Sequence, residues 1–258
     1  MPASHAGGVA RTPSEPHGLW TIDFKGEFRT RDHRYCYPLT VTDLASRFLL
    51  AVQGQRSPAG APVTACTEAL FREHGLPAAI HCDGGSPFTG RGIGGYSHVS
   101  LRWLRLGIRI ERSRRACPQD NASHERMHRT LKAGTQRPPA QDLPAQQRLF
   151  DRFRREFNYE RPHEALGDRT PAECYCHSSR PYPRRLPPFC YPGHFELRRI
   201  SHGGGFKWHS REVFLGSVFA GQLIGFEEID DGVWSVYLAR HLLARFDERL
   251  GRLIEVPV

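Results

Sequence analysis

The chain has 258 residues, of which 39% are hydrophobic, and its formal net charge is +9 at pH 7. This length accommodates one large domain and one small one, and no apolar run approaches the roughly 18 residues that a membrane span needs. Residues 1–17 lack the apolar core of a signal peptide and are expected to be a disordered lead-in. We therefore expect a cytoplasmic protein that is not bound to a membrane, and its seven scattered cysteines are expected to be free thiols.

The first two thirds of the chain alternate between strand-like and helix-like patterns. Five short apolar segments predict β-strands at 19–24, 35–42, 47–52, 78–82 and 108–111. Four helical patterns cover 62–74, 96–106, 118–133 and 144–159. Pro118 is expected to open the third helix, and Gly134 to end it. The first three strands suggest an antiparallel meander, and the whole order predicts an α/β domain with a mixed sheet.

The last third of the chain has a different composition. Prolines are dense over residues 181–193, which predicts a semi-rigid extended linker. Beyond the linker, strand-like runs recur between turn signals, and residues 207–215 are expected to form one of these strands. The Asp230-Asp231-Gly232 turn between two apolar runs is a strong hairpin signal. About five strands over residues 194–258 predict a small β-barrel.

Three acidic residues lie on three different predicted elements. Asp23 is the only acid in its strand, Asp83 follows the end of another strand, and Glu125 lies in a basic helical segment. Each alone is as consistent with a solvated side chain as with a function. Together they suit phosphodiester chemistry, in which carboxylates hold two Mg²⁺ ions roughly 3.5–4 Å apart. We expect Asp23 to bridge the two ions from its rigid strand, and Asp83 and Glu125 to complete one ion each.

Positive charge is concentrated around Glu125. Residues 101–137 contain ten basic and three acidic residues, so this window alone carries +7. Such a concentration predicts a polyanionic partner, most commonly nucleic acid, although an ordinary solvated face is the alternative. Two of the basic residues lie at i+4 and i+7 from Glu125, on the same helical face, where they would contact a metal-bound phosphate. The candidate DNA contacts are Arg129, Lys132, Arg114 and Arg115.

A competing interpretation concerns the same helix. Residues 124–128 have the sequence His-Glu-Arg-Met-His, which matches the H-E-x-x-H pattern of zinc proteases. The extended form of that pattern fails, because Leu131 and Gly134 stand where it requires a Gly and a third His. This charged helix would also be expensive to bury, so the carboxylate site is favoured.

Several motifs of the chain together resemble those of a known family. The motifs that carry the resemblance are Asp23-Phe-Lys-Gly26, Pro38-Leu-Thr-Val-Thr-Asp43, Asp83-Gly-Gly-Ser-Pro-Phe88, Leu104-Arg-Leu-Gly-Ile108, His124-Glu-Arg-Met-His-Arg-Thr-Leu-Lys132 and Asn158-Tyr-Glu-Arg-Pro-His-Glu-Ala-Leu166. They are similar to those of bacterial insertion-sequence transposases with a retroviral-integrase-type core. The resemblance covers roughly residues 18–180, and the C-terminal segment looks like the SH3-like barrel that follows this core in several such enzymes.

The resemblance implies an RNase H-like fold, with a mixed five-stranded sheet and flanking helices, followed by the small SH3-like β-barrel. It implies a D-D-E triad of Asp23, Asp83 and Glu125 with two Mg²⁺ or Mn²⁺ ions and no small-molecule cofactor. The implied reaction is cleavage and strand transfer on DNA, with element ends and target DNA as partners. The protein would act as a homo-oligomer on DNA in the bacterial cytoplasm, associated with the nucleoid. The expected domains are a lead-in (1–17), the core (18–180), the linker (181–193) and the barrel (194–258).

The chain departs from the family pattern at three places. Gly84 stands where the family usually has Asn, and Ala122 stands where it usually has Gly. The N-terminal helix-turn-helix region that binds element ends is not expected in the short segment before the first strand. The alternative function is therefore a catalytically silent, truncated remnant that binds DNA, and a general RNase H-like nuclease is a third possibility.

Overall fold

The computed structural model describes residues 14–113, 122–186 and 188–255, without the side chains of residues 122–125 and 255. The chain divides into two compact units, Met1–Gly84 with Gly107–Tyr182 and Gly85–Leu106 with Pro183–Val258. Across the described residues, no helix has the length and apolar character needed to cross a membrane.

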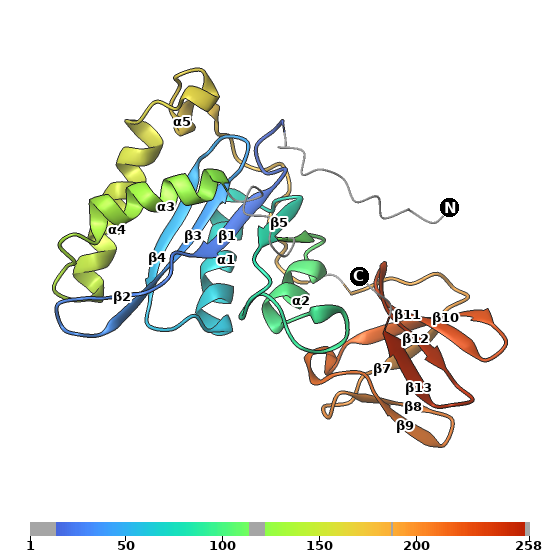
Figure 1. Ribbon diagram of the computed structural model, residues 1–258. Helices are drawn as coiled ribbons and strands as arrows, with labels where there is room; N and C mark the ends of the chain where they lie inside the picture. Colours follow the sequence, from blue (N-terminus) through green and yellow to red (C-terminus); the bar gives the residue numbers. More distant parts are fainter. Residues whose placement is uncertain (1–13, 114–121, 187, 256–258) are drawn as a thin grey trace. The chain divides into compact units, whose positions relative to one another are not determined.

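The first unit is built on a mixed sheet in which six strands are described (Figure 1). These are Trp20–Phe24 (β1), Phe28–Arg29 (β2), Tyr35–Asp43 (β3), Leu49–Gln55 (β4), Ala79–Cys82 (β5) and Arg109–Arg112 (β6). β1, β3 and β4 form an antiparallel meander, whereas β5 pairs in parallel with β1, and β6 in parallel with β5. The resulting order is β4-β3-β1-β5-β6, with the two-residue β2 beside β3. β1 is therefore central in the sheet.

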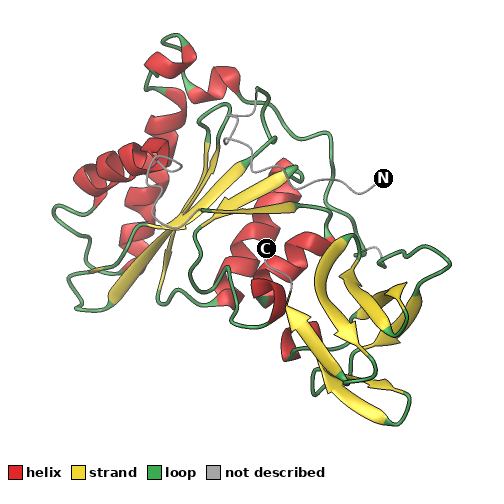
Figure 2. Ribbon diagram, turned by 45° about the vertical axis from the view of Figure 1, so that its right-hand side comes forward, coloured by secondary structure: helices red, strands yellow, loops and turns green. Residues whose placement is uncertain are grey.

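Helices cover both faces of this sheet (Figures 1 and 2). They are Gly60–His74 (α1), Ala122–Thr135 (α3), Leu143–Tyr159 (α4) and the short Pro171–Cys174 (α5). α1 packs on one face, where its Phe71 ring stacks on Trp20 of β1 at 5.7 Å. α3 and α4 pack on the other face, where Leu131 and Phe150 share a buried cluster with Leu49 of β4. Because side chains alternate along a strand, Thr21 and Asp23 of β1 face away from α1.

The predicted elements of this unit are largely confirmed. All five predicted strands are present, and β2 escaped prediction because it is only two residues long. The prediction that Gly134 ends the third helix is wrong, because α3 continues to Thr135. The Thr135 hydroxyl donates to the Leu131 carbonyl, and the Gln146 side chain donates to the Thr135 carbonyl, both at 2.7 Å. The predicted helix start at Pro118 lies outside the described residues.

The second unit contains helix α2 (His98–Arg105) and two antiparallel sheets. Its described strands are Glu196–Arg199 (β7), Gly205–Trp208 (β8), Arg211–Phe214 (β9), Leu223–Asp230 (β10), Val233–Leu238 (β11), His241–Asp247 (β12) and Arg252–Glu255 (β13). Five of them form a sheet in the order β13-β12-β11-β10-β7, and β8 pairs with β9. Buried aromatic rings form its core, including Phe206, Phe226 and Phe246. This antiparallel sheet is consistent with the predicted SH3-like part.

Two predictions for the second unit have opposite outcomes. The Asp230-Asp231-Gly232 hairpin is confirmed, since β10 and β11 pair across it and Gly232 has a φ of +69°. The single strand expected over residues 207–215 is wrong. The chain reverses at His209, which has a φ of +50°, and β8 and β9 therefore form a hairpin. Apolar residues on both sides of this two-residue turn were interpreted in the sequence as one long strand.

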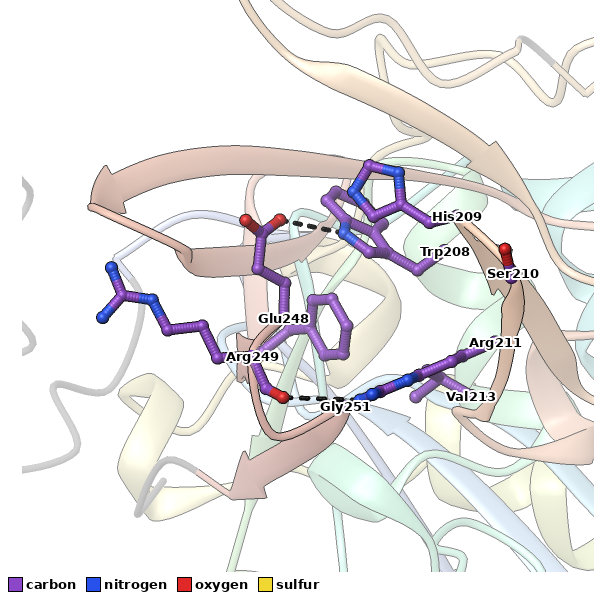
Figure 3. A pocket seen from close by; sticks show the side chains of 9 residues that line it. Trp208, His209, Ser210, Arg211, Val213, Glu248, Arg249 and Gly251 are labelled. Carbon is purple, nitrogen blue, oxygen red and sulfur yellow. Dashed lines mark hydrogen bonds between the residues drawn. The ribbon is translucent and has the colours of Figure 1, made fainter.

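A pocket of about 330 Å³ lies beside Trp208 in the second unit (Figure 3). The Glu248 Oε2 atom accepts hydrogen bonds from the indole N–H groups of Trp208 and Trp234, at 2.9 and 3.0 Å. Arg211 donates to the backbone carbonyl of Arg249 at 3.3 Å. These bonds connect the turn between β12 and β13 to the aromatic core and to the β8–β9 hairpin.

Candidate active site

Asp23 and Asp83 lie at neighbouring positions in the sheet. β1 and β5 run in parallel, with Ile22 paired to Cys82. Asp23 follows Ile22 in β1, and Asp83 follows Cys82 directly after the end of β5. Parallel strands deliver the residues at their carboxyl ends to the same edge of a sheet. Asp83 is exposed to solvent, whereas the Asp23 side chain is only 24% exposed. The tertiary structure therefore brings together two acids that are sixty residues apart in sequence.

The Asp23 carboxyl lies in an environment that disfavours its negative charge. Burial, and next the negative charge of Asp83, raise its pKa from 3.8 to about 6. The Phe24 backbone N–H, which donates a hydrogen bond, and the Lys25 charge lower it to a smaller extent. Two carboxylates that repel each other in a partly buried site form an arrangement that a divalent cation would stabilise.

His128 of α3 belongs to this site, although the sequence indicated it only as a zinc ligand. Its side chain is 6% exposed, its Nδ1 atom lies 3.9 Å from Asp23 Oδ2, and its Nε2 atom lies 2.8 Å from Thr40 Oγ1. The Thr40 hydroxyl is also 3.1 Å from the Asp23 carbonyl oxygen. His128 and Thr40 therefore connect α3 to the β1–β3 pair at Asp23. The signal in the sequence was the position of His128, one helical turn after Glu125.

The remaining predicted site residues are placed less completely. Glu125 lies in α3, but its side chain is outside the described part of the chain. Arg129 and Lys132 are exposed on the same helix. Arg114 and Arg115 lie outside the described residues. Within the described residues, which exclude the Glu125 side chain, no group of three or more His, Cys, Asp or Glu is placed to hold a metal ion.

Two family models described as integrase core domain match this chain, one over residues 13–118 and the other over residues 106–171. The chain therefore resembles the integrase core domain over residues 13–171. It is also 29% identical over 164 residues to an uncharacterized protein of Caenorhabditis elegans, a match that covers 63% of this chain. The chain spans only 12% of the length of that relative.

Solved structures of integrases resemble this chain in fold. A chain of the simian T-cell lymphotropic virus intasome has a TM-score of 0.55 at 14% identity, over 91% of this chain and 81% of that chain. The HTLV-2 integrase catalytic core domain, in complex with magnesium, has a TM-score of 0.47 at 11% identity, over 62% of this chain and 97% of that chain. The intasome match confirms the predicted fold, a mixed sheet with flanking helices. The family models support a function of the transposase or integrase type.

Proposed function

We propose that this protein is a D-D-E polynucleotidyl transferase that cleaves DNA and joins DNA strands. The observation that carries the proposal is the pair of acids at the adjacent ends of β1 and β5, within an integrase-type core. We propose Glu125 as the third acid. It precedes His128 by three positions on α3, and positions three apart share a helical face. His128 contacts Asp23, so that face of α3 is directed to the candidate site.

The acids present fit two Mg²⁺ or Mn²⁺ ions, because carboxylate oxygens are the preferred ligands of these cations. When bound, such ions activate the attacking oxygen and stabilise the leaving oxygen of a phosphodiester. Asp23 would bridge the two ions, and burial, together with the charge of Asp83, raises its pKa to about 6, an effect that a bound cation would oppose. Asp83 and Glu125 would each hold one ion. Thr40 and His128 would keep Asp23 in position through the contacts described above.

DNA is the proposed partner because the protein is strongly basic and its basic residues gather near Glu125. Arg129 and Lys132 are exposed on α3, and we propose that they contact phosphates on either side of the reacting bond. Arg114 and Arg115 are proposed to extend this surface. Element ends and target DNA are the proposed substrates, and the proposed active form is a homo-oligomer on DNA.

The test is a nicking and strand-transfer assay with purified protein, supercoiled plasmid and a labelled oligonucleotide, in Mg²⁺ and in Mn²⁺. The wild type is expected to nick DNA and to join the oligonucleotide to the plasmid only when metal is present. Asp83→Asn and Glu125→Gln are expected to reduce both reactions to background. Asp151→Asn removes the charge of an exposed acid on α4 and is expected to leave them unchanged. If both site variants nick at the wild-type rate, the proposed site is wrong.

Two further outcomes of these assays would support the alternative functions. Salt-sensitive DNA binding without cleavage, in both metals and on all substrates, would support the silent DNA-binding remnant. Preferential cleavage of RNA–DNA hybrid over duplex DNA would support a general RNase H-like nuclease.

Arg129→Gln and Lys132→Gln are each expected to lower the slope of log affinity against log salt by about one, as the loss of one phosphate contact requires.

A further inference from the structure

A second pocket lies in the first unit, next to the candidate active site but not lined by Asp23 or Asp83. It has a volume of about 450 Å³, and Thr21 of β1 and Thr42 of β3 contribute to its floor. Thr21 is two residues before Asp23, so the two side chains lie on the same face of β1. The turn between β3 and β4, α3, the end of α4 and the loop that follows α4 supply the remaining lining. The volume lies within the range of about 300–1,000 Å³ that is typical of small-ligand sites.

Three arginines that are distant in sequence line this pocket: Arg47, Arg126 and Arg161. In the described part of the chain, no carboxylate forms an ion pair with any of them. Burial, and next the charge of Arg126, lower the pKa of Arg47, whereas Asp43 acts in the opposite direction. The pocket therefore gathers positive charge whose mutual repulsion an anion would relieve.

Two residues of the lining, Thr42 and His163, each carry a fully buried side-chain atom, Thr42 Oγ1 and His163 Nε2, with no hydrogen-bond partner among the described residues. Thr42 is 8% exposed. A buried polar group without a partner costs about 1–3 kcal/mol, and such groups are rare in folded proteins. Because these two atoms have no accessible surface, they lie beneath the lining, and it is the positive charge of the lining that indicates an anionic ligand.

The rest of the lining is apolar and includes Met127 and Phe157. A bare anion would leave this apolar surface without a partner, whereas a nucleotide presents a charged phosphate and a flat, weakly polar base. Arg47 is held toward this site by a turn that keeps its backbone in the left-handed region, with a φ of +61°. This conformation costs a residue with a side chain roughly 1–2 kcal/mol.

We propose that this pocket binds one nucleotide of a DNA strand, with the phosphate between the arginines and the sugar and base against the apolar lining. The choice of DNA as the source of the nucleotide rests on the proposed function, whereas binding of nucleotides as a class does not. In this arrangement Arg47, Arg126 and Arg161 hold a phosphate beside the reacting one. The unpaired base of a DNA end enters the pocket, and the pocket thereby positions the strand relative to Asp23.

The sequence provides a local probe for this pocket. The chain contains only two methionines, Met1 and Met127, and Met127 lines the pocket. In protein labelled with ¹³C in the methionine methyl groups, the signal of the Met127 methyl group reports directly whether a ligand occupies the pocket. Titrations would use thymidine 5′-monophosphate, inorganic phosphate, thymidine, and duplex DNA with or without a three-nucleotide overhang, all in EDTA.

We expect saturable shifts of the Met127 signal with the mononucleotide and with overhang DNA, and weaker effects of phosphate, thymidine and blunt DNA. Arg161→Gln and Arg47→Asn are expected to lower mononucleotide affinity about tenfold or more, because each removes a charged hydrogen-bond donor. Asn is chosen at position 47 because it tolerates a positive φ. Arg155→Gln, an exposed site on α4 outside the pocket, is the matched control and is expected to have no effect.

Each remaining outcome separates this proposal from the proposed function. An unchanged Met127 signal with every ligand would refute the pocket, even if the protein nicks DNA. Equal shifts of the Met127 signal with phosphate and with mononucleotide would show that the pocket binds anions and not nucleotides. Equal shifts with thymidine in the wild type and in the arginine variants would show that the pocket is only an apolar cavity. A response to the mononucleotide but not to overhang DNA would refute DNA as the source. Binding by Asp83→Asn protein that no longer nicks would show that the pocket acts independently of the catalytic acids.

Discussion

The raised pKa of Asp23 predicts that the wild-type protein loses stability as the pH rises. In the unfolded chain the carboxyl titrates near its ordinary value of 3.8, and in the folded protein it titrates near 6. Between these values the folded state binds more protons, so the free energy of unfolding falls as the pH rises from about 4 to about 6. The two pKa values correspond to at most about 3 kcal/mol, which is lost in full above pH 6.

Replacement of Asp23 with Asn removes this charge and should recover most of that free energy. We expect Asp23→Asn to be more stable than wild type at pH 7.5 by about 1–3 kcal/mol and to match it near pH 4. The assay is urea unfolding in EDTA, followed by hydrogen exchange of peptides from β1 and β3, because these peptides report on the first unit alone. A variant that is less stable than wild type at pH 7.5 would refute the charge environment inferred for Asp23.

Asp32 provides a matched control, because its pKa is shifted in the opposite direction to that of Asp23. The Thr30 hydroxyl donates a hydrogen bond to its carboxylate and lowers the pKa of Asp32. A lowered pKa stabilises the folded state above the unfolded value, and that stability is lost as the pH falls through the folded value. Asp32→Asn should therefore be less stable than wild type at pH 7.5, with the difference disappearing in acid. Added Mg²⁺ should narrow the gap between wild type and Asp23→Asn and leave the effect of Asp32→Asn unchanged.

Three further substitutions test packing and hydrogen bonds elsewhere. Asn158→Ala should destabilise the protein by about 2–4 kcal/mol in urea unfolding, because the Asn158 side chain bonds both the backbone N–H and the backbone carbonyl of buried Leu49. Gly54→Ala should cost about 1–3 kcal/mol, because the added Cβ would lie 2.7 Å from a methyl group of Leu143. Glu248→Ala leaves two indole N–H groups without their acceptor, and should change tryptophan fluorescence and destabilise the second unit by about 1–3 kcal/mol.

Each of these three predictions has a result that would contradict it. A wild-type urea midpoint for the Asn158 variant would mean that water replaces both hydrogen bonds without cost. An unchanged midpoint for the Gly54 variant would show that α4 moves freely away from β4. Loss of stability in peptides of the first unit, but not of the second, would contradict the position assigned to Glu248.

Local sequence patterns were sufficient for most of the secondary structure. Alternating apolar residues identified the central strand that carries Asp23, and a short apolar run identified the strand that ends before Asp83. The pattern failed at His209, where a two-residue turn separates two short apolar segments that were interpreted as one strand. It also failed at Gly134, where α3 continues to Thr135 and the Gln146 side chain of α4 donates one hydrogen bond to the Thr135 carbonyl.

The candidate site was predicted residue by residue but not as an environment. The sequence identified Asp23 and Asp83 as candidates, and the pairing of β1 with β5 brings them to neighbouring positions. The contact of His128 with Asp23 and Thr40 could not be derived, because it depends on how α3 is rotated against the sheet. The burial that raises the pKa of Asp23 depends on the same packing.

The sequence by itself determined the order of strands and helices, the strands that deliver the two acids, and the basic character of the region around Glu125. These features depend on residues within a few positions of one another, so hydrophobic period and turn chemistry are sufficient to specify them. Only the tertiary structure decided that burial and the charge of Asp83 raise the pKa of Asp23, and that Arg47, Arg126 and Arg161 line one pocket. Such features depend on distances between distant parts of the chain, which are set by the packing of α3 and α4 on the sheet and leave no local pattern.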